Sequence, residues 1–248
     1  MLGIPQQNTN TKKFPKMVEQ TAPVENGMYK AIFTGFTTLG FHEDDFNEGK
    51  FKFYVNLSFE AIEDMAGNKL GEFKKKFDDG TETVGPRCFF KEIPLADDLH
   101  HKSNGFAIAK ALAPDTPTIA RGKEKEHTYI VGFDWEKHLG KTVLLQISKR
   151  KAKSGTEYNK VESVMPLGLP LEGAIEPKFF NLYNPDLMEI FESLDGFTKK
   201  KIRESKPIAG EPEVVYRGES EEEEAPKAPV DAPEEGEAPV DFDDDIPF

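Results

Sequence analysis

The sequence predicts a mainly β protein with one helix inserted between strands, a C-terminal amphipathic helix and a long acidic tail. Two observations support the β core: several segments alternate apolar and polar residues, and these segments are rich in aromatic and β-branched side chains. A third observation limits its size, because apolar residues make up only 37% of the 248 residues. This content is enough for one core of ordinary size but not for the whole chain.

The clearest strand is predicted over FKFYVNLSFEAI, residues 51–62. Because side chains of a strand alternate between its two faces, its apolar set is expected in the core: Phe51, Phe53, Val55, Leu57 and Phe59. Residues 28–41 form another predicted strand, with Gly35 and Gly40 as bulge or turn points. Further strands are predicted at 72–77, 127–133, 141–153 and 153–167, the last two joined at Ser154 and Gly155.

Two segments are predicted to be helical. Residues 102–114 have apolar side chains three and four residues apart, with Ser103 or Asn104 as the N-cap and Pro114 as the end. Residues 184–205 begin near Pro185 and end in a basic turn, as the helix dipole favours, with Gly196 as a predicted break. Five to six strands with one inserted helix are typical of a small closed barrel of the oligonucleotide/oligosaccharide-binding (OB) type.

Composition divides the chain into four parts. We predict a flexible N-terminal arm at 1–23, an OB-like domain at 24–170, a helical extension at 171–205 and a disordered acidic tail at 206–248. The tail is rich in Pro, Glu and Ala, and such a segment cannot bury enough apolar surface to fold. Residues 219–248 carry a net charge of −12, whereas residues 1–218 carry −1. The acidic total of −13 therefore does not exclude nucleic acid as a partner of the folded part.

Several classes of protein and site are disfavoured. The single cysteine, Cys88, cannot form an intramolecular disulfide, which fits a reducing compartment. The sequence shows no signal peptide and no apolar run of about 18 residues, so we expect a cytoplasmic protein without a membrane partner. A phosphate-cradling GxxxxGK[ST] motif is absent, and we expect no cofactor, no metal and no catalytic residue.

One stretch leaves a metal-dependent nuclease open as a weaker alternative. Asp97, Asp98, His100 and His101 follow one another closely. Adjacent histidines on a strand or helix are expected to point apart, however, and no second cluster completes a coordination sphere. A polar loop before the helix is the favoured interpretation.

Basic and aromatic residues interleave in three stretches, at 50–54, 73–77 and 148–160. Binding of a single strand without sequence preference needs cations that follow the phosphates and exposed rings on which bases stack. The predicted contacts with single-stranded DNA are Lys50, Lys52, Tyr54, Lys74, Lys76, Trp135, Lys149, Arg150, Lys151, Lys153, Tyr158 and Lys160. Alternatives remain for some: Tyr54 and Trp135 could belong to the core instead, and the cations at 149–153 could be a solvated hairpin.

The last eight residues, DFDDDIPF, resemble the C-terminal tip of bacterial single-stranded DNA-binding proteins. The resemblance covers this tip and the general design of a folded domain, a proline-rich acidic linker and an acidic end. It implies an OB domain that coats single-stranded DNA, and a tip that docks on enzymes of replication, repair and recombination. The implied docking residues are three carboxylates for a basic rim and three apolar residues for a pocket: Asp243, Asp244, Asp245, Ile246, Pro247 and Phe248.

The rest of the chain differs from the bacterial family in its opening strand and in the places of its helices. The chain is therefore more similar to a phage-encoded single-stranded DNA-binding protein, whose partners would be host or phage replication and recombination enzymes. A monomer or dimer is expected rather than the bacterial tetramer. The alternative is an adaptor or decoy that occupies the docking pockets of host enzymes and does not bind DNA.

Overall fold

The computed structural model describes residues 17–44, 47–122 and 125–216, and these form a mainly β structure, as predicted. The main sheet has six strands, five of them antiparallel neighbours in the order β11-β10-β2-β3-β6, while β12 pairs in parallel with β2. Their bounds are β2 Gly27–Asp44, β3 Asn47–Asp64, β6 Cys88–Pro94, β10 Thr142–Lys151, β11 Glu157–Pro166 and β12 Lys178–Phe180.

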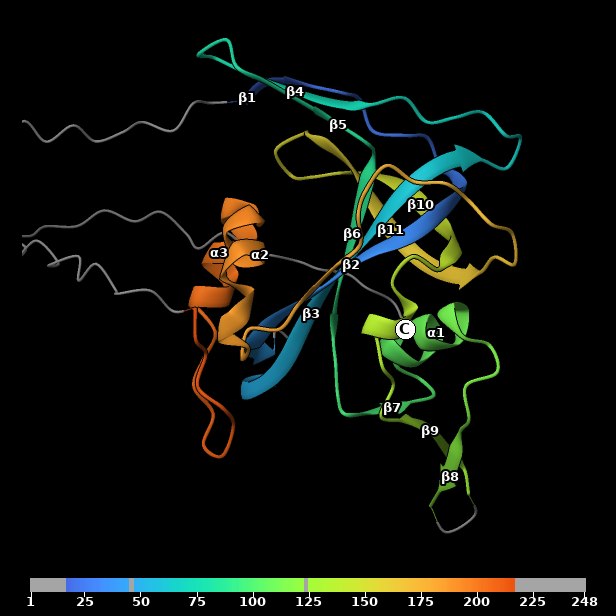
Figure 1. Cartoon of the computed structure of the whole chain (residues 1–248), viewed down its shortest axis with the longest axis vertical. Coiled ribbons are helices and arrows are strands. Elements are labelled where there is room, and N and C mark those ends of the chain that lie inside the picture. The colour runs from blue at the N-terminus through green and yellow to red at the C-terminus, as the bar shows by residue number, and fades with distance from the viewer. Residues whose placement is uncertain (1–16, 45–46, 123–124, 217–248) are drawn as a thin grey trace, which may run out of the picture. The chain divides into compact units, whose positions relative to one another are not determined.

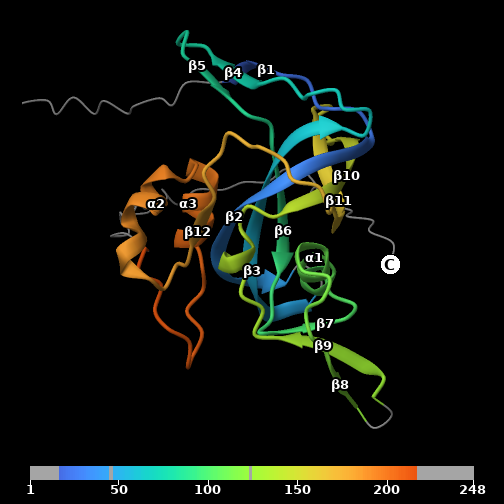
Figure 2. The ribbon, with the colours of Figure 1, turned by 45° about the vertical axis from the view of Figure 1, so that its right-hand side comes forward.

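Two small antiparallel sheets accompany the main sheet. One has the order β1-β4-β5, with β1 Met17–Gln20, β4 Phe73–Phe77 and β5 Glu82–Gly85. The other has the order β7-β9-β8, with β7 Asp98–His100, β8 Ile119–Arg121 and β9 His127–Val131. They lie at opposite ends of the main sheet, at the top and bottom of Figures 1 and 2. The predicted N-terminal arm is therefore wrong for Met17–Gln20, which pair with β4.

The long strands β2 and β3 supply the centre of the core. Val55, Leu57 and Phe59 are fully buried, which confirms the predicted alternation. Phe51 is 39% exposed, so its predicted place in the core is wrong, because it lies near the tip of the hairpin. The register of β2 against β3 shifts at Gly35 and at Gly40, as predicted for bulges. Gly40 has a φ of 92°, and a Cβ there would lie 2.0 Å from Ser205 Oγ.

The predicted closed barrel is not formed by the described residues, because the edge strands β6 and β11 share no backbone ladder. A side chain joins them instead. Lys91, between the buried Phe89 and Ile93 of β6, donates from Nζ to the carbonyl oxygens of Val161 (2.7 Å) and Glu162 (3.2 Å) of β11. Burial of this ammonium lowers the pKa of Lys91, chiefly by desolvation. The two edges thus approach each other through a half-buried cation.

The predicted inserted helix is present as α1, Asn104–Leu112. Ser103 is the N-cap, as predicted, and its hydroxyl accepts a hydrogen bond from the backbone N–H of Phe106 at 3.1 Å. Ile108, Ala109 and Leu112 pack into the main core beside β6, β10 and β11. The helix therefore covers the core where the sheet edges approach each other.

Residues 178–216 form what we call the C-terminal extension. It contains β12, a short 3₁₀ turn at Pro185–Leu187, α2 (Met188–Ser193) and α3 (Gly196–Arg203), so the predicted break at Gly196 is confirmed. The extension has its own hydrophobic cluster, which includes Val214 and Tyr216. The predicted start of the tail at residue 206 is therefore wrong, since burial of these two side chains continues the folded part to at least residue 216.

Figures 1 and 2 show α2 and α3 on one side of the β2–β3 ribbon and α1 on the other. Within the described ranges, no helix has both the length and the apolar character that a membrane span requires.

Candidate nucleic-acid interface

The outward face of β3 and β6 carries polar and aromatic side chains that the core does not use. Antiparallel pairing places Ser58 opposite Phe90, and the next outward pair is Asn56 and Glu92. Phe90 is 59% exposed in the middle of a strand, whereas its neighbour Phe89 is buried. An exposed ring on a sheet face is a platform on which a base can stack.

Two hollows flank Phe90. The first, of about 240 Å³, lies among β1, β4, the start of β6 and the β10–β11 hairpin, and its lining includes Phe73, Arg87 and Tyr158. The second, of about 230 Å³, lies between the outward face of the main sheet and helices α2 and α3. Its lining includes Asn56, Ser58 and Lys178.

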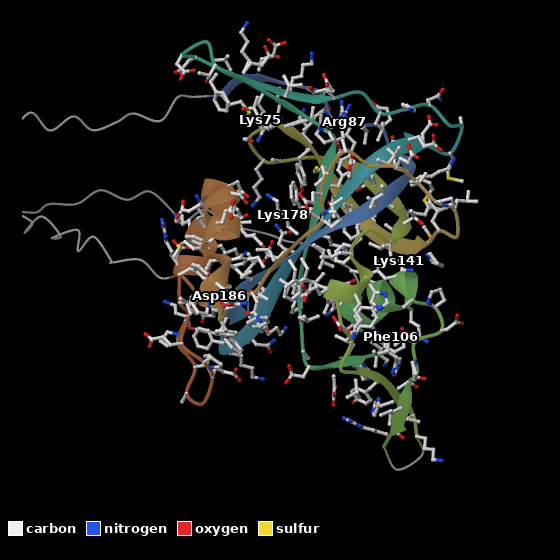
Figure 3. All side chains as sticks on the ribbon, viewed as in Figure 1. Lys75, Arg87, Phe106, Lys141, Lys178 and Asp186 are labelled. Carbon is white, nitrogen blue, oxygen red and sulfur yellow. The ribbon has the colours of Figure 1, made fainter. Side chains whose placement is uncertain are left out.

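Cys88 and Phe90 line both hollows, so the hollows adjoin across β6. We call this track the β6 groove, defined by Asn56, Ser58, Phe73, Arg87, Cys88, Phe90, Tyr158 and Lys178. Figure 3 shows Arg87 near the start of β6, and Lys178 between β6 and the helices α2 and α3. Each hollow of the groove therefore has a cation in its lining.

The groove contains two buried polar atoms without a hydrogen-bond partner. Among the described residues only three side-chain atoms are in this state, and two of them are Arg87 Nε and Asn56 Oδ1. Arg87 Nη1 donates to Ala22 O at 2.9 Å, which holds the guanidinium in place. Buried polar groups are normally satisfied by protein, water or ligand. A guanidinium N–H suits a phosphate oxygen, and an amide oxygen can accept from the amino group of a base.

Three carboxylates line the two hollows, and two of them, Glu157 and Asp195, are engaged with the protein itself, while Glu176 is exposed. Glu157 pairs with Lys149 at 3.0 Å, and Asp195 accepts a hydrogen bond from the backbone N–H of Thr198 at the start of α3. These contacts reduce the repulsion that a phosphate would meet. The Cys88 thiol is a poor nucleophile, because burial, with a smaller effect of Glu60, raises its pKa to about 11.

Among the first predicted contacts, Lys52 and Tyr54 share the outward face of β3 with Asn56 and Ser58, as the alternation predicts. Lys50 is exposed near the start of the strand. Lys52 pairs with the buried carboxylate of Asp44 at 2.7 Å. Tyr54 is half-buried, and Lys201 Nζ of α3 lies 5.8 Å from the centre of its ring. The extension therefore covers part of this ring, and the role of Tyr54 as a stacking platform stays a prediction.

The second predicted stretch lies on β4. Lys74 and Lys76 are exposed and share a face, and Phe73, Lys75 and Phe77 share the other, as predicted. Phe73 lines the groove, with Lys75 Nζ 5.4 Å from its ring centre. The groove is thus next to the half-buried face of β4, whereas Lys74 and Lys76 are on the opposite face.

The third predicted stretch forms the β10–β11 hairpin, with its turn at Ser154 and Gly155 as predicted. Lys149 pairs with Glu25 and Glu157, and Arg150 pairs with Glu162 at 2.6 Å. The exposed cations of the hairpin are Arg150, Lys151, Lys153 and Lys160. Tyr158 is 47% exposed and lines the groove, so of the predicted aromatic contacts it is the one that the structure presents to a ligand.

Trp135 is only 7% exposed and packs against Phe36 and Phe133. Its prediction as a DNA contact is therefore wrong, and its alternative place in the core is confirmed. The predicted docking residues Asp243, Asp244, Asp245, Ile246, Pro247 and Phe248 lie outside the described residues.

The histidines of the acidic stretch do not point apart, so that expectation is also wrong. The ring centres of His100 and His101 are 4.2 Å apart, because β7 ends at His100 and His101 begins a turn. His127 of β9 joins them, which the sequence did not indicate. In the described part of the chain, the candidate ligand group contains these three histidines without Asp97 or Asp98. The Asp98 carboxylate instead pairs with Arg121 at 2.5 Å.

Of the eight residues that define the groove, only Tyr158 is among the predicted contacts. A signal was present for Phe90, since CFFKEIP places Phe89 and Ile93 on one face of a strand and Phe90 on the other. Lys178 and Arg87 join the groove only through tertiary packing, for which the local sequence carries no sign. Comparison of the chain with family models, curated proteins and solved structures found no match.

Proposed function

We propose that the chain is a non-enzymatic protein that binds single-stranded DNA with little sequence preference, and that the β6 groove holds the strand. One observation carries the proposal: an exposed phenylalanine lies between two hollows, each lined by a residue that has an unpartnered buried polar atom. This combination offers a base a stacking surface and a phosphate a fixed guanidinium.

The order of the strands supports an OB-type fold for this part of the chain. Along the chain, the five antiparallel strands are β2, β3, β6, β10 and β11, and their spatial order is fifth, fourth, first, second, third. The helix α1 follows the third strand and packs near the third and fifth. A five-stranded, partly open barrel with this kind of crossing order is the OB design, and its second and third strands carry the ligand face. Those strands are β3 and β6, whose outward face forms part of the groove.

Binding in the groove would proceed without a reaction. Bases would stack on Phe90 and Tyr158, while phosphates would contact Arg87, Lys178 and the exposed cations of the hairpin. Stacking on a ring face tolerates every base, and phosphate contacts carry no sequence information. Coating and protection of single strands during replication, recombination and repair would follow from this mode of binding.

The C-terminal tip adds a second part to the proposal, which rests on the sequence alone. Its terminal Ile-Pro-Phe, preceded by three aspartates, would dock in an apolar pocket with a basic rim on a partner enzyme. Recruitment through the tip and binding through the groove use separate residues. An adaptor without DNA binding would need only the tip, so a test of the groove separates the two functions.

Fluorescence anisotropy with labelled dT oligonucleotides at several salt concentrations provides this test, on the full chain. We expect affinity for dT to fall as salt rises, with a logarithmic slope of about −0.7 for each phosphate contact. A duplex of equal length is the matched control and is expected to bind more weakly, because its bases are already stacked. Absence of dT binding at low salt would reject the DNA-coating function and favour the adaptor.

A further inference from the structure

Three histidines meet at one edge of the small sheet β7-β9-β8. His100 ends β7, His101 follows it in a turn, and His127 begins β9, which pairs with β7. His100 Nε2 and His127 Nδ1 are 3.2 Å apart, and one ring nitrogen from each histidine lies within 4.8 Å of the other two. Each of the three side chains is half-buried, so the cluster is fixed by the fold and still reached by solvent.

We infer that His100, His101 and His127 bind a late first-row divalent metal ion of the Zn²⁺ class. Two nitrogens that ligate one tetrahedral Zn²⁺ at 2.0–2.1 Å lie about 3.3–3.4 Å apart, close to the distance between His100 Nε2 and His127 Nδ1. Imidazole ligands suit Zn²⁺, Cu²⁺ and Ni²⁺, whereas Mg²⁺ and Ca²⁺ prefer oxygen ligands. Three protein ligands leave a fourth position for water.

Two ring nitrogens of the cluster accept hydrogen bonds from the backbone. Nδ1 of His100 accepts from the backbone N–H of Lys102, and Nδ1 of His101 accepts from the backbone N–H of Thr128, both at 3.2 Å. Each of these neutral rings therefore carries its proton on Nε2. When a metal binds Nε2, that proton moves to Nδ1 and the two weak hydrogen bonds break. The backbone amides of Lys102 and Thr128 should therefore change their environment when a metal binds.

A carboxylate adjoins the cluster at His127. On its far side, His127 Nε2 lies 3.7 Å from Glu126 Oε1, which resembles the carboxylate that usually orients a ligating histidine.

A bound metal would join the end of β7 to the start of β9, next to the N-cap of α1. The inference is independent of DNA binding, because none of the three histidines lines the β6 groove. Since a ligand that binds only the folded state stabilises it, Zn²⁺ is expected to raise the melting temperature.

The test uses the full chain without a polyhistidine tag, freed of metal by a chelator and titrated with Zn²⁺ against a chromophoric chelator. We expect one tight equivalent of Zn²⁺. Its affinity should fall more than about 100-fold in His127→Ala and in His101→Ala, because removal of a ligand should weaken binding more than removal of a group that only hydrogen-bonds to a ligand. His42→Gln is the matched control. Every variant keeps the acidic tail, so cation binding by the tail is the same in all of them.

A second readout needs no variant. Addition of Zn²⁺ is expected to shift the backbone amide signals of Lys102 and Thr128 in a ¹⁵N–¹H spectrum of the full chain. Equal Zn²⁺ affinity in the full chain and the two alanine variants would overturn the inference. Signals at Lys102 and Thr128 that do not move at one equivalent would overturn it as well.

Discussion

Replacement of Phe90 by alanine tests the groove at its centre. Stacking of one base on an aromatic side chain contributes about 1–3 kcal/mol, so the substitution should weaken binding of a dT oligonucleotide about 5-fold to 150-fold. The Phe90 ring is 59% exposed, and it therefore contributes less than half of what a fully buried phenylalanine contributes to folding. The free energy of unfolding should fall by less than about 1.5 kcal/mol. Affinity and stability are thus expected to respond to different degrees.

The assay is anisotropy of labelled dT at one fixed salt concentration, followed by a salt series. The slope of log affinity against log salt should stay the same in Phe90→Ala, because the ring contacts no phosphate. Phe197→Ala is the matched control, since Phe197 is 73% exposed on α3 and lies outside the lining of both hollows. Urea unfolding of each variant verifies that it is folded.

Two results would refute the reasoning. A folded Phe90→Ala variant that binds dT within about twofold of the full chain would show that no base stacks on this ring. An equal loss in Phe197→Ala would show that exposed aromatics matter wherever they lie, which is inconsistent with a groove.

Three further predictions follow from other contacts. Lys178→Gln should reduce the magnitude of the salt slope by about 0.7, with Lys141→Gln as an unchanged control, and an unaltered slope would remove Lys178 from the phosphate track. Lys91→Met should lower the free energy of unfolding in urea by about 1.5–3 kcal/mol, since two β11 carbonyls lose a charged donor; unchanged stability would mean that the edges of the sheet do not depend on it. Truncation after Gly218 removes a net charge of −12 and should tighten dT binding at low salt more than at high salt, whereas equal affinities at low salt would contradict competition between tail and DNA.

Local signals in the sequence predicted local structure well. The alternation in residues 51–62 placed Val55, Leu57 and Phe59 in the core, and the serine before the inserted helix identified its N-cap. The break at Gly196 followed from helix propensity. Each of these features depends on residues that are neighbours along the chain, so a pattern of a few residues is sufficient to predict it.

The candidate site was harder to predict, because it is built from distant segments. Trp135 lies in a polar stretch, DWEKH, yet its ring is buried by Phe36 and Phe133 from other elements. The three histidines converge because a strand ends at His100 and another begins at His127. Neither the period of a strand nor the spacing of residues contains this information.

The C-terminal extension explains why the sequence analysis favoured β3 while the structure favours β6. Tyr54 was the expected platform, but α3 places Lys201 over its ring and pairs that lysine with Glu92 at 2.5 Å. The same extension supplies Lys178 to the hollow beside Phe90. The extension covers part of Tyr54 and contributes Lys178 beside Phe90, so it is part of the proposed binding surface. Detachment of the extension would therefore expose the Tyr54 ring and remove Lys178 from the hollow beside Phe90.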